Sequence, residues 1–174
     1  MRQLFILISL SCVCLSSFAN QSSTAHEWLD RLSSSLKELN FNTSFVVVEN
    51  NGAEPYRWLH GKDNDGTELE ILSVLNGPRR DVARKNAKVS YIEPNKAPYT
   101  VESSVISGPI PMAFSGKVEE LTDSYSFVLV GRSRILGRVS QVIRIVPRDP
   151  HRYAHWLWLD QESGLLLKLA LTTK

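Results

Sequence analysis

The last third of the chain has the hydrophobic pattern of consecutive β-strands. Over Tyr125–Leu171, four apolar segments follow one another with turn residues between them: Ser126–Val130, Gln141–Val146, Tyr153–Asp160 and Leu165–Leu171. The connections are too short to hold crossover helices, which parallel pairing would need. This part of the sequence therefore predicts an antiparallel meander.

Both faces of the predicted sheet carry apolar side chains. Apolar residues stand side by side in the strands, as at Val142-Ile143 and Trp156-Leu157. Neighbouring residues on a strand point to opposite faces, and a sheet with one wet face would alternate between apolar and polar residues. We therefore expect the second apolar face to be covered by a helix, a second sheet or an apolar ligand.

One long amphipathic helix is predicted near the start of the chain, over Ala25–Leu39. Thr24 followed by Glu27 is a capping-box pattern at its beginning, and Asn40 is the expected C-terminal cap. Its apolar face is formed by residues at helical spacing: Trp28, Leu29, Leu32, Leu36 and Leu39. This helix is the natural cover for one face of the sheet.

Between the helix and the meander the pattern is that of short strands. The predicted strands are Phe41–Glu49, Tyr56–His60, Thr67–Leu75, Arg79–Arg84, Lys88–Glu93 and Tyr99–Glu102. Asn50-Asn51-Gly52 is a strong hairpin signal. A short helix is the alternative for Thr67–Leu75, where the Glu-Leu-Glu-Ile alternation favours a strand. The apolar, proline-rich loop Ser107–Gly116 either packs on the core or lids a cavity, and a helical turn is expected at Val118–Leu121.

Residues 1–19 have the pattern of a secretory signal peptide. Arg2 supplies the positive start, Leu4–Leu15 is a short apolar run, and Ser17-Phe18-Ala19 offers the small residues that a signal peptidase needs. The run is too short to span a bilayer. We expect cleavage after Ala19 and one mature domain over residues 20–174. Both cysteines of the chain precede that point, so the mature domain has no disulfide, which favours a bacterial periplasm over a small secreted scaffold.

Composition narrows the class of protein further. With 174 residues, 43% hydrophobic residues and a mean hydropathy of −0.15, the chain fits one soluble globular domain. Its formal net charge of +2 is too small to predict a nucleic-acid partner.

The sequence carries no pattern that predicts catalysis. His151 and His155 would suggest a metal pair on a helix, but on a strand residues four apart are separated by about 13 Å. A glycine-rich phosphate loop and a nucleophile elbow are absent, and the carboxylates are scattered. We therefore expect a protein that is not an enzyme, with no metal and no cofactor.

Basic residues are concentrated in the meander. Its arginines all stand at even positions: Arg132, Arg134, Arg138, Arg144, Arg148 and Arg152. They either form solvated strand faces and hairpin ends, or they form a docking surface for acidic segments of a partner or for lipid phosphates. Trp156 and Trp158 share one face of a predicted strand, so at least one tryptophan-bearing face is expected to be buried.

Several motifs together resemble the MucB/RseB family of periplasmic regulators of the envelope-stress sigma factor. They are Leu75-Asn76-Gly77-Pro78-Arg79-Arg80, Ser90-Tyr91-Ile92-Glu93-Pro94, Val130-Gly131-Arg132-Ser133-Arg134-Ile135, Val142-Ile143-Arg144-Ile145-Val146 with Arg148-Asp149, and Arg152-Tyr153 leading to Trp158-Leu159-Asp160 with Glu162-Ser163. The resemblance implies an α+β domain similar to the lipoprotein carriers LolA and LolB. That fold is a strongly curved antiparallel half-barrel wrapped around one or more helices, with an apolar cavity. It also implies that this domain is incomplete at its C-terminal end and that the family's smaller C-terminal domain is absent from the chain.

The resemblance also implies a function. Members of the family bind the periplasmic region of a membrane-anchored anti-sigma factor and shield it from proteolysis, and lipid or lipopolysaccharide is the signal that weakens this binding. The alternative is a periplasmic lipid or lipoprotein carrier of the LolA type. No membrane-spanning segment is expected, and homo-oligomerisation is left open.

Residue type and position suggest which residues contact a lipid and which contact an anion or the partner. The lipid-cavity candidates are Phe45, Trp58, Phe127, Trp156 and Trp158. The candidates that face an anion or the partner are Arg132, Arg134 and Arg144.

Overall fold

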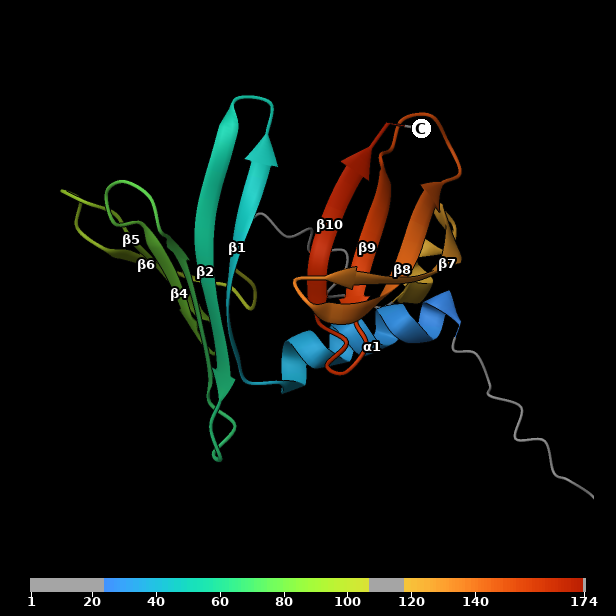
Figure 1. Ribbon diagram of the computed structural model, residues 1–174. Coiled ribbons are helices and arrows are strands. Elements are labelled where there is room, and N and C mark those ends of the chain that lie inside the picture. Colours follow the sequence, from blue (N-terminus) through green and yellow to red (C-terminus); the bar gives the residue numbers. More distant parts are fainter. Residues whose placement is uncertain (1–23, 107–117, 174) are drawn as a thin grey trace, which may run out of the picture.

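The computed structural model describes residues 24–106 and 118–173, and it shows an α+β protein with antiparallel, unclosed sheets (Figure 1). Sheet A has the strand order β1-β2-β3-β4-β5-β6, and sheet B has the order β10-β9-β8-β7. The elements are α1 (Ala25–Glu38), β1 (Phe41–Glu49), β2 (Gly52–Lys62), β3 (Glu68–Val74), β4 (Asp81–Lys85), β5 (Lys88–Ile92), β6 (Tyr99–Glu102), the 3-10 turn η2 (Val118–Leu121), β7 (Tyr125–Ile135), β8 (Arg138–Pro147), β9 (Ala154–Asp160) and β10 (Leu166–Thr172).

Helix α1 begins where the capping box predicts. The Glu27 backbone N–H donates to Thr24 Oγ1 over 3.2 Å, and the Thr24 backbone N–H donates to Glu27 Oε2 over 2.8 Å. These reciprocal bonds satisfy two donors that the first turn of a helix leaves free. The predicted C-terminal cap is wrong, because Leu39 is the cap residue and the Asn40 side chain binds the backbone of Lys62 instead.

Sheet A is built from successive hairpins. Glu49 pairs with Gly52, so Asn50 and Asn51 form the tight turn that the sequence predicts. The ambiguous segment Thr67–Leu75 contains strand β3, as its alternation indicates. Arg84 of β4 lies on the same face as Glu70 of β3, and its Nε donates to Glu70 Oε2 over 2.8 Å.

Sheet B is the predicted antiparallel meander, and α1 covers one of its faces. The shared core consists of Ala25, Trp28, Leu29 and Leu32 of the helix, Val118 of η2, and Ile143, Ile145, Leu157 and Leu159 of the sheet. The sheet residues of this core alternate along β8 and β9, as expected for a strand face that packs on a helix. The prediction that the helix covers one face of the meander is confirmed.

The turn between β9 and β10 ties sheet B to the helix. Arg31 Nη2 donates to the Glu162 carbonyl over 2.5 Å, and Ser35 Oγ donates to the Ser163 carbonyl over 2.6 Å. Gly164 has a positive φ of 76°, and a Cβ built there would lie 2.8 Å from Arg31 Cγ. A glycine is therefore needed both for the turn and for the close approach of the helix.

The described strands leave four edges. Within residues 24–106 and 118–173, β1 and β6 end sheet A, and β7 and β10 end sheet B. The predicted signal peptide at 1–19 and the predicted loop Ser107–Gly116 lie outside the described residues. In the part of the chain that the structure describes, no helix has the length and apolar character needed to cross a membrane.

Candidate functional site

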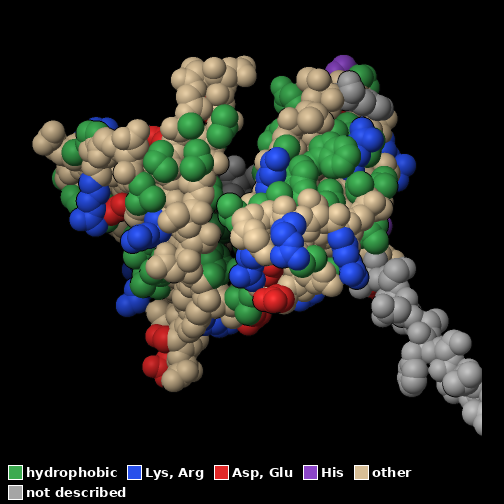
Figure 2. Space-filling view, viewed as in Figure 1, with side chains coloured by type: hydrophobic (Ala, Val, Ile, Leu, Met, Phe, Trp, Pro, Cys, Tyr) green, Lys and Arg blue, Asp and Glu red, His purple; other side chains and the backbone are tan. Residues whose placement is uncertain are grey.

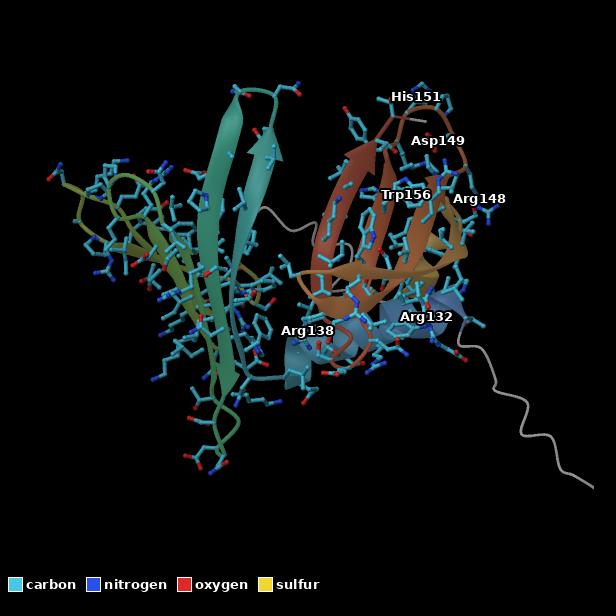
Figure 3. All side chains as sticks on the ribbon, viewed as in Figure 1. Arg132, Arg138, Arg148, Asp149, His151 and Trp156 are labelled. Carbon is cyan, nitrogen blue, oxygen red and sulfur yellow. The ribbon has the colours of Figure 1, made fainter. Side chains whose placement is uncertain are left out.

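The face of sheet B that lies opposite α1 presents two stacked indoles. Leu157 and Leu159 of β9 point into the helix core, so the alternating residues Trp156 and Trp158 point to the other side. Their ring centroids lie 6.3 Å apart with an interplanar angle of 27°. Both side chains are half-buried. Figure 3 shows Trp156 on sheet B.

A basic side chain stacks over each indole. Arg144 of β8 pairs with Trp156, and its Cζ lies 5.3 Å from the ring centroid. Lys168 of β10 pairs with Trp158, and its Nζ lies 4.7 Å from that ring. These are cation–π distances, at which the negative ring face attracts the cation.

Two rows of directly paired residues form this face. The first row is Val128, Arg144, Trp156 and Ala170, and the second row contains Val142, Trp158 and Lys168. We call the surface formed by Val128, Val142, Arg144, Trp156, Trp158 and Lys168 the tryptophan face. Val128 is 46% exposed, so the face has open apolar area as well as charge.

Among the described residues, the two cations of the tryptophan face have no carboxylate partner. Among the described residues, neither Arg144 nor Lys168 takes part in an ion pair, and Arg144 Nε is buried without a hydrogen-bond partner. A cation that lacks an acidic partner can form a charge-assisted hydrogen bond with an incoming carboxylate. The face is therefore suited to an anionic group.

The carboxylate beside the tryptophan face is already occupied. Asp160 accepts hydrogen bonds from Arg138 Nε over 2.9 Å and from Arg138 Nη2 over 2.7 Å. It also accepts from the Ser163 backbone N–H and from Ser163 Oγ. The Arg138 guanidinium, helped by Ser163, holds the pKa of Asp160 well below its ordinary value. Asp160 is therefore engaged as an anion and does not neutralise Arg144 or Lys168.

The whole of sheet B has a surplus of positive charge. Residues 125–172 contain seven basic and three acidic side chains. The acidic ones, Asp149, Asp160 and Glu162, are all ion-paired with Arg152 or Arg138. Figure 2 shows hydrophobic side chains gathered over sheet B with Lys and Arg side chains around them.

The predicted anion-facing arginines do not share one face. The register of β7 and β8 shifts between Leu129 and Gly131, so Arg132 pairs with Gln141 and Arg134 pairs with Val139. Arg132 and Arg134 therefore lie on the opposite side of the sheet from Arg144. The shared even numbering is wrong as a guide because a β-bulge inserts one residue and exchanges the faces.

The predicted cavity residues are distributed over three surfaces. Phe45 and Trp58 lie on one face of sheet A, where Phe45 stacks on Tyr56 with ring centroids 5.4 Å apart. Phe127 packs against the helix core on sheet B. Trp156 and Trp158 lie on the tryptophan face, so of the eight candidates the structure places these two beside Arg144.

The Trp58 indole is fixed by polar contacts. Its Nε1 donates to Glu70 Oε1 over 2.7 Å, and its ring meets Phe41 edge-to-face at 5.1 Å. Glu70 also accepts from Arg84, so this part of sheet A is a satisfied network.

Lys168 was missed by the sequence reasoning. Its position opposite Trp158 depends on a second register shift, between Leu166 and Lys168. The available signal was a lone basic residue within the apolar segment Leu165–Leu171.

The two histidines of the meander do not share a site. His151 lies in the turn before β9, whereas His155 lies on β9, where burial lowers its pKa. Within the described ranges no group of three or more His, Cys, Asp or Glu side chains is placed to hold a metal ion.

A half-buried aromatic surface whose cations have no ion-pair partner among the described residues is typical of a binding protein. A family model described as the MucB/RseB N-terminal domain matches residues 24–174. The chain belongs to the MucB/RseB family.

Curated relatives agree with this assignment. The chain is 34% identical over 173 residues to the sigma-E factor regulatory protein RseB of Escherichia coli K12, covering 98% of this chain and 54% of that protein. It is 31% identical over 153 residues to the sigma factor AlgU regulatory protein MucB of Pseudomonas aeruginosa, covering 88% of this chain and 47% of that protein. The chain thus spans about half the length of the curated relatives it matches.

Solved structures share the fold. A crystal structure of MucB superimposes with a TM-score of 0.68 at 29% identity, covering 86% of this chain and 53% of that one. The complex of Pseudomonas aeruginosa MucA and MucB gives a TM-score of 0.67 at 29% identity, covering 86% of this chain and 51% of that one.

Proposed function

We propose that this protein is a periplasmic negative regulator of the envelope-stress sigma factor. It binds the periplasmic region of a membrane-anchored anti-sigma factor and shields that region from proteolysis. The observation that carries the proposal is the family match over residues 24–174, together with the structural likeness to MucB, which has been crystallised in complex with MucA(peri).

Regulation follows from the equilibrium between the bound and the free form of the anti-sigma factor. A segment bound to this protein is inaccessible to a protease, so the rate of cleavage depends on the fraction that is unbound. A lipid that binds better to the free regulator than to the complex shifts the balance toward the free, cleavable partner. Lipid or lipopolysaccharide is the proposed signal.

Apolar and aromatic residues on sheet A support a lipid-binding role. Phe41, Phe45, Tyr56 and Trp58 lie on one face, where adjacent rings stack or meet edge-to-face. Val89 on the same face is fully buried, while Phe45 and Trp58 are only half-buried. An acyl chain packed on the half-buried rings would remove further apolar area from water.

Binding to MucA(peri) and protection of it test the proposal directly. The purified protein is titrated into MucA(peri) by calorimetry, and cleavage of MucA(peri) by a broad-specificity protease is followed in the same mixtures. We expect saturable binding and a cleavage rate that falls in proportion to the bound fraction. Lipopolysaccharide added to the complex is expected to restore cleavage.

Full-length Pseudomonas aeruginosa MucB is the positive control. Absence of binding and of protection at concentrations where MucB gives both would contradict the proposal. Transfer of an acylated protein between membrane vesicles, without binding to MucA(peri), would instead support the carrier of the LolA type.

A further inference from the structure

The tryptophan face points to a particular kind of partner. Two of its residues are cations that stack on indoles and form no ion pair within residues 24–106 and 118–173, and Val128 beside Arg144 is 46% exposed. A partner that fits must therefore bring negative charge and apolar side chains together. We propose that the tryptophan face is a docking surface for an acidic, partly apolar segment of polypeptide.

Charge complementarity argues for the acidic component. The acidic side chains of sheet B form ion pairs with Arg138 and Arg152. In the part of the chain that the structure describes, Arg144 and Lys168 form no ion pair. Arg144 and Trp156 are paired across the strands, and so are Trp158 and Lys168, on the neighbouring row. An extended segment that crosses both rows meets one cation in each, with indole area beside it.

Geometry argues for a peptide over a membrane surface. A membrane-anchoring tryptophan inserts its ring among lipids, but Trp156 and Trp158 are half-buried and each has a cation stacked on it. The result is a mixed aromatic and basic surface on the strands, which suits a segment that alternates apolar and acidic side chains. Apolar residues of the segment would cover Val128 and the indole edges, and carboxylates would approach Lys168 and the guanidinium of Arg144.

This inference rests on the proposed function in one respect: the segment is assigned to the regulated partner. The surface itself is testable with a defined peptide, which separates the two ideas. The probes are MucA(peri) and a fluorescein-labelled peptide of alternating Glu and Leu residues. Peptides of alternating Lys and Leu, and of alternating Glu and Ser, are the comparison probes.

The main variant is Lys168→Glu, whose exposed side chain can be exchanged without disturbing the core. We expect it to weaken binding of the Glu–Leu peptide by at least about tenfold in fluorescence anisotropy, and to improve binding of the Lys–Leu peptide. Trp158→Leu is expected to weaken binding of the Glu–Leu peptide without improving binding of the Lys–Leu peptide. Lys88→Glu, an exposed charge reversal on sheet A, is the matched control and should change binding by less than about twofold.

The outcomes separate the surface from the function. Equal binding of MucA(peri) and of the Glu–Leu peptide to the wild type and to Lys168→Glu overturns the docking surface and leaves the proposed function standing. Binding of the Glu–Leu peptide through Lys168, without binding of MucA(peri), supports the surface and contradicts its assignment to that partner. Lys168-dependent binding to phosphatidylglycerol vesicles with no peptide binding would overturn the peptide proposal in favour of a lipid surface.

Discussion

At the scale of single residues, the buried carboxylate of Asp160 is the most informative group. It is 1% exposed, it accepts two hydrogen bonds from Arg138 and two from Ser163, and it closes the turn that meets helix α1. Because these contacts hold its pKa below the ordinary value, the unfolded chain binds the proton more readily than the folded one. The stabilisation is therefore complete above the ordinary aspartate pKa of about 3.9 and is lost as the pH falls below it.

Asp160→Asn removes this charge and should lower the free energy of unfolding by about 2 kcal/mol at neutral pH. The difference between wild type and variant should shrink between pH 5 and pH 2, because the unfolded wild-type chain then takes up a proton that the folded chain does not bind, which lowers the stability of the wild type. Urea unfolding across this range measures both effects. Asp149→Asn, which breaks a more exposed pair with Arg152, should cost less than about 1 kcal/mol, and a pH-independent loss at Asp160 would contradict the charge argument.

At the scale of elements, the periodicity of side chains was enough to locate most of the fold. The α1 helix and the ten strands fall where apolar spacing and turn residues place them, because both signals are local. The capping box and the Asn50-Asn51 turn are likewise short-range patterns.

The candidate site was only partly predictable, because it depends on pairing between strands. Trp156 and Trp158 belong to one strand, so their shared face follows from the sequence alone. The β-bulges at Leu129/Gly131 and Leu166/Lys168 are properties of strand pairs. Without these two bulges, the sequence places Arg132 on the same face as Arg144, and it does not predict the pairing of Lys168 with Trp158.

The contact between α1 and the β9–β10 turn offers a test at the same scale. Gly164→Ala adds a Cβ that would lie 2.8 Å from Arg31 Cγ and 2.9 Å from Ser35 Oγ, in a left-handed backbone conformation. We expect a loss of about 2–4 kcal/mol in the free energy of unfolding, measured by urea titration.

Gly66→Ala separates the two causes. Gly66 has a φ of 79° but no heavy atom within 4 Å of a Cβ built there. Gly66→Ala should lower the free energy of unfolding only by the cost of the left-handed backbone conformation, which is about 1 kcal/mol. An equal loss at both positions would mean that the helix adjusts to the new methyl group and that the close approach is not limiting.

At the scale of the whole molecule, the helix joins two sheets that have separate hydrogen-bond ladders. Helix α1 shares its core with sheet B, and its C-terminal end is attached to β2 of sheet A. His60 Nδ1 lies 2.7 Å from the Leu39 carbonyl, and the Lys62 backbone N–H donates to Asn40 Oδ1 over 2.8 Å. Figure 1 shows α1 beneath sheet B, with the chain passing from its end into β1.

The contact between the Asn40 side chain and the Lys62 backbone allows a test of whether the two sheets unfold independently. Asn40→Ala removes the acceptor of the Lys62 amide, so this amide should exchange its hydrogen at least about tenfold faster, with smaller increases along β1 and β2. Amides of β8 and β9 should keep their wild-type rates, because their ladder and the helix core are unchanged. Hydrogen exchange followed by mass spectrometry or NMR measures each strand separately.

Lys62→Ala is the matched control, since it removes the 3.7 Å ion pair with Glu38 but leaves the backbone bond to Asn40 in place. If Asn40→Ala accelerates exchange equally in both sheets, they open as one cooperative unit, and a ligand bound to either sheet would then stabilise the other.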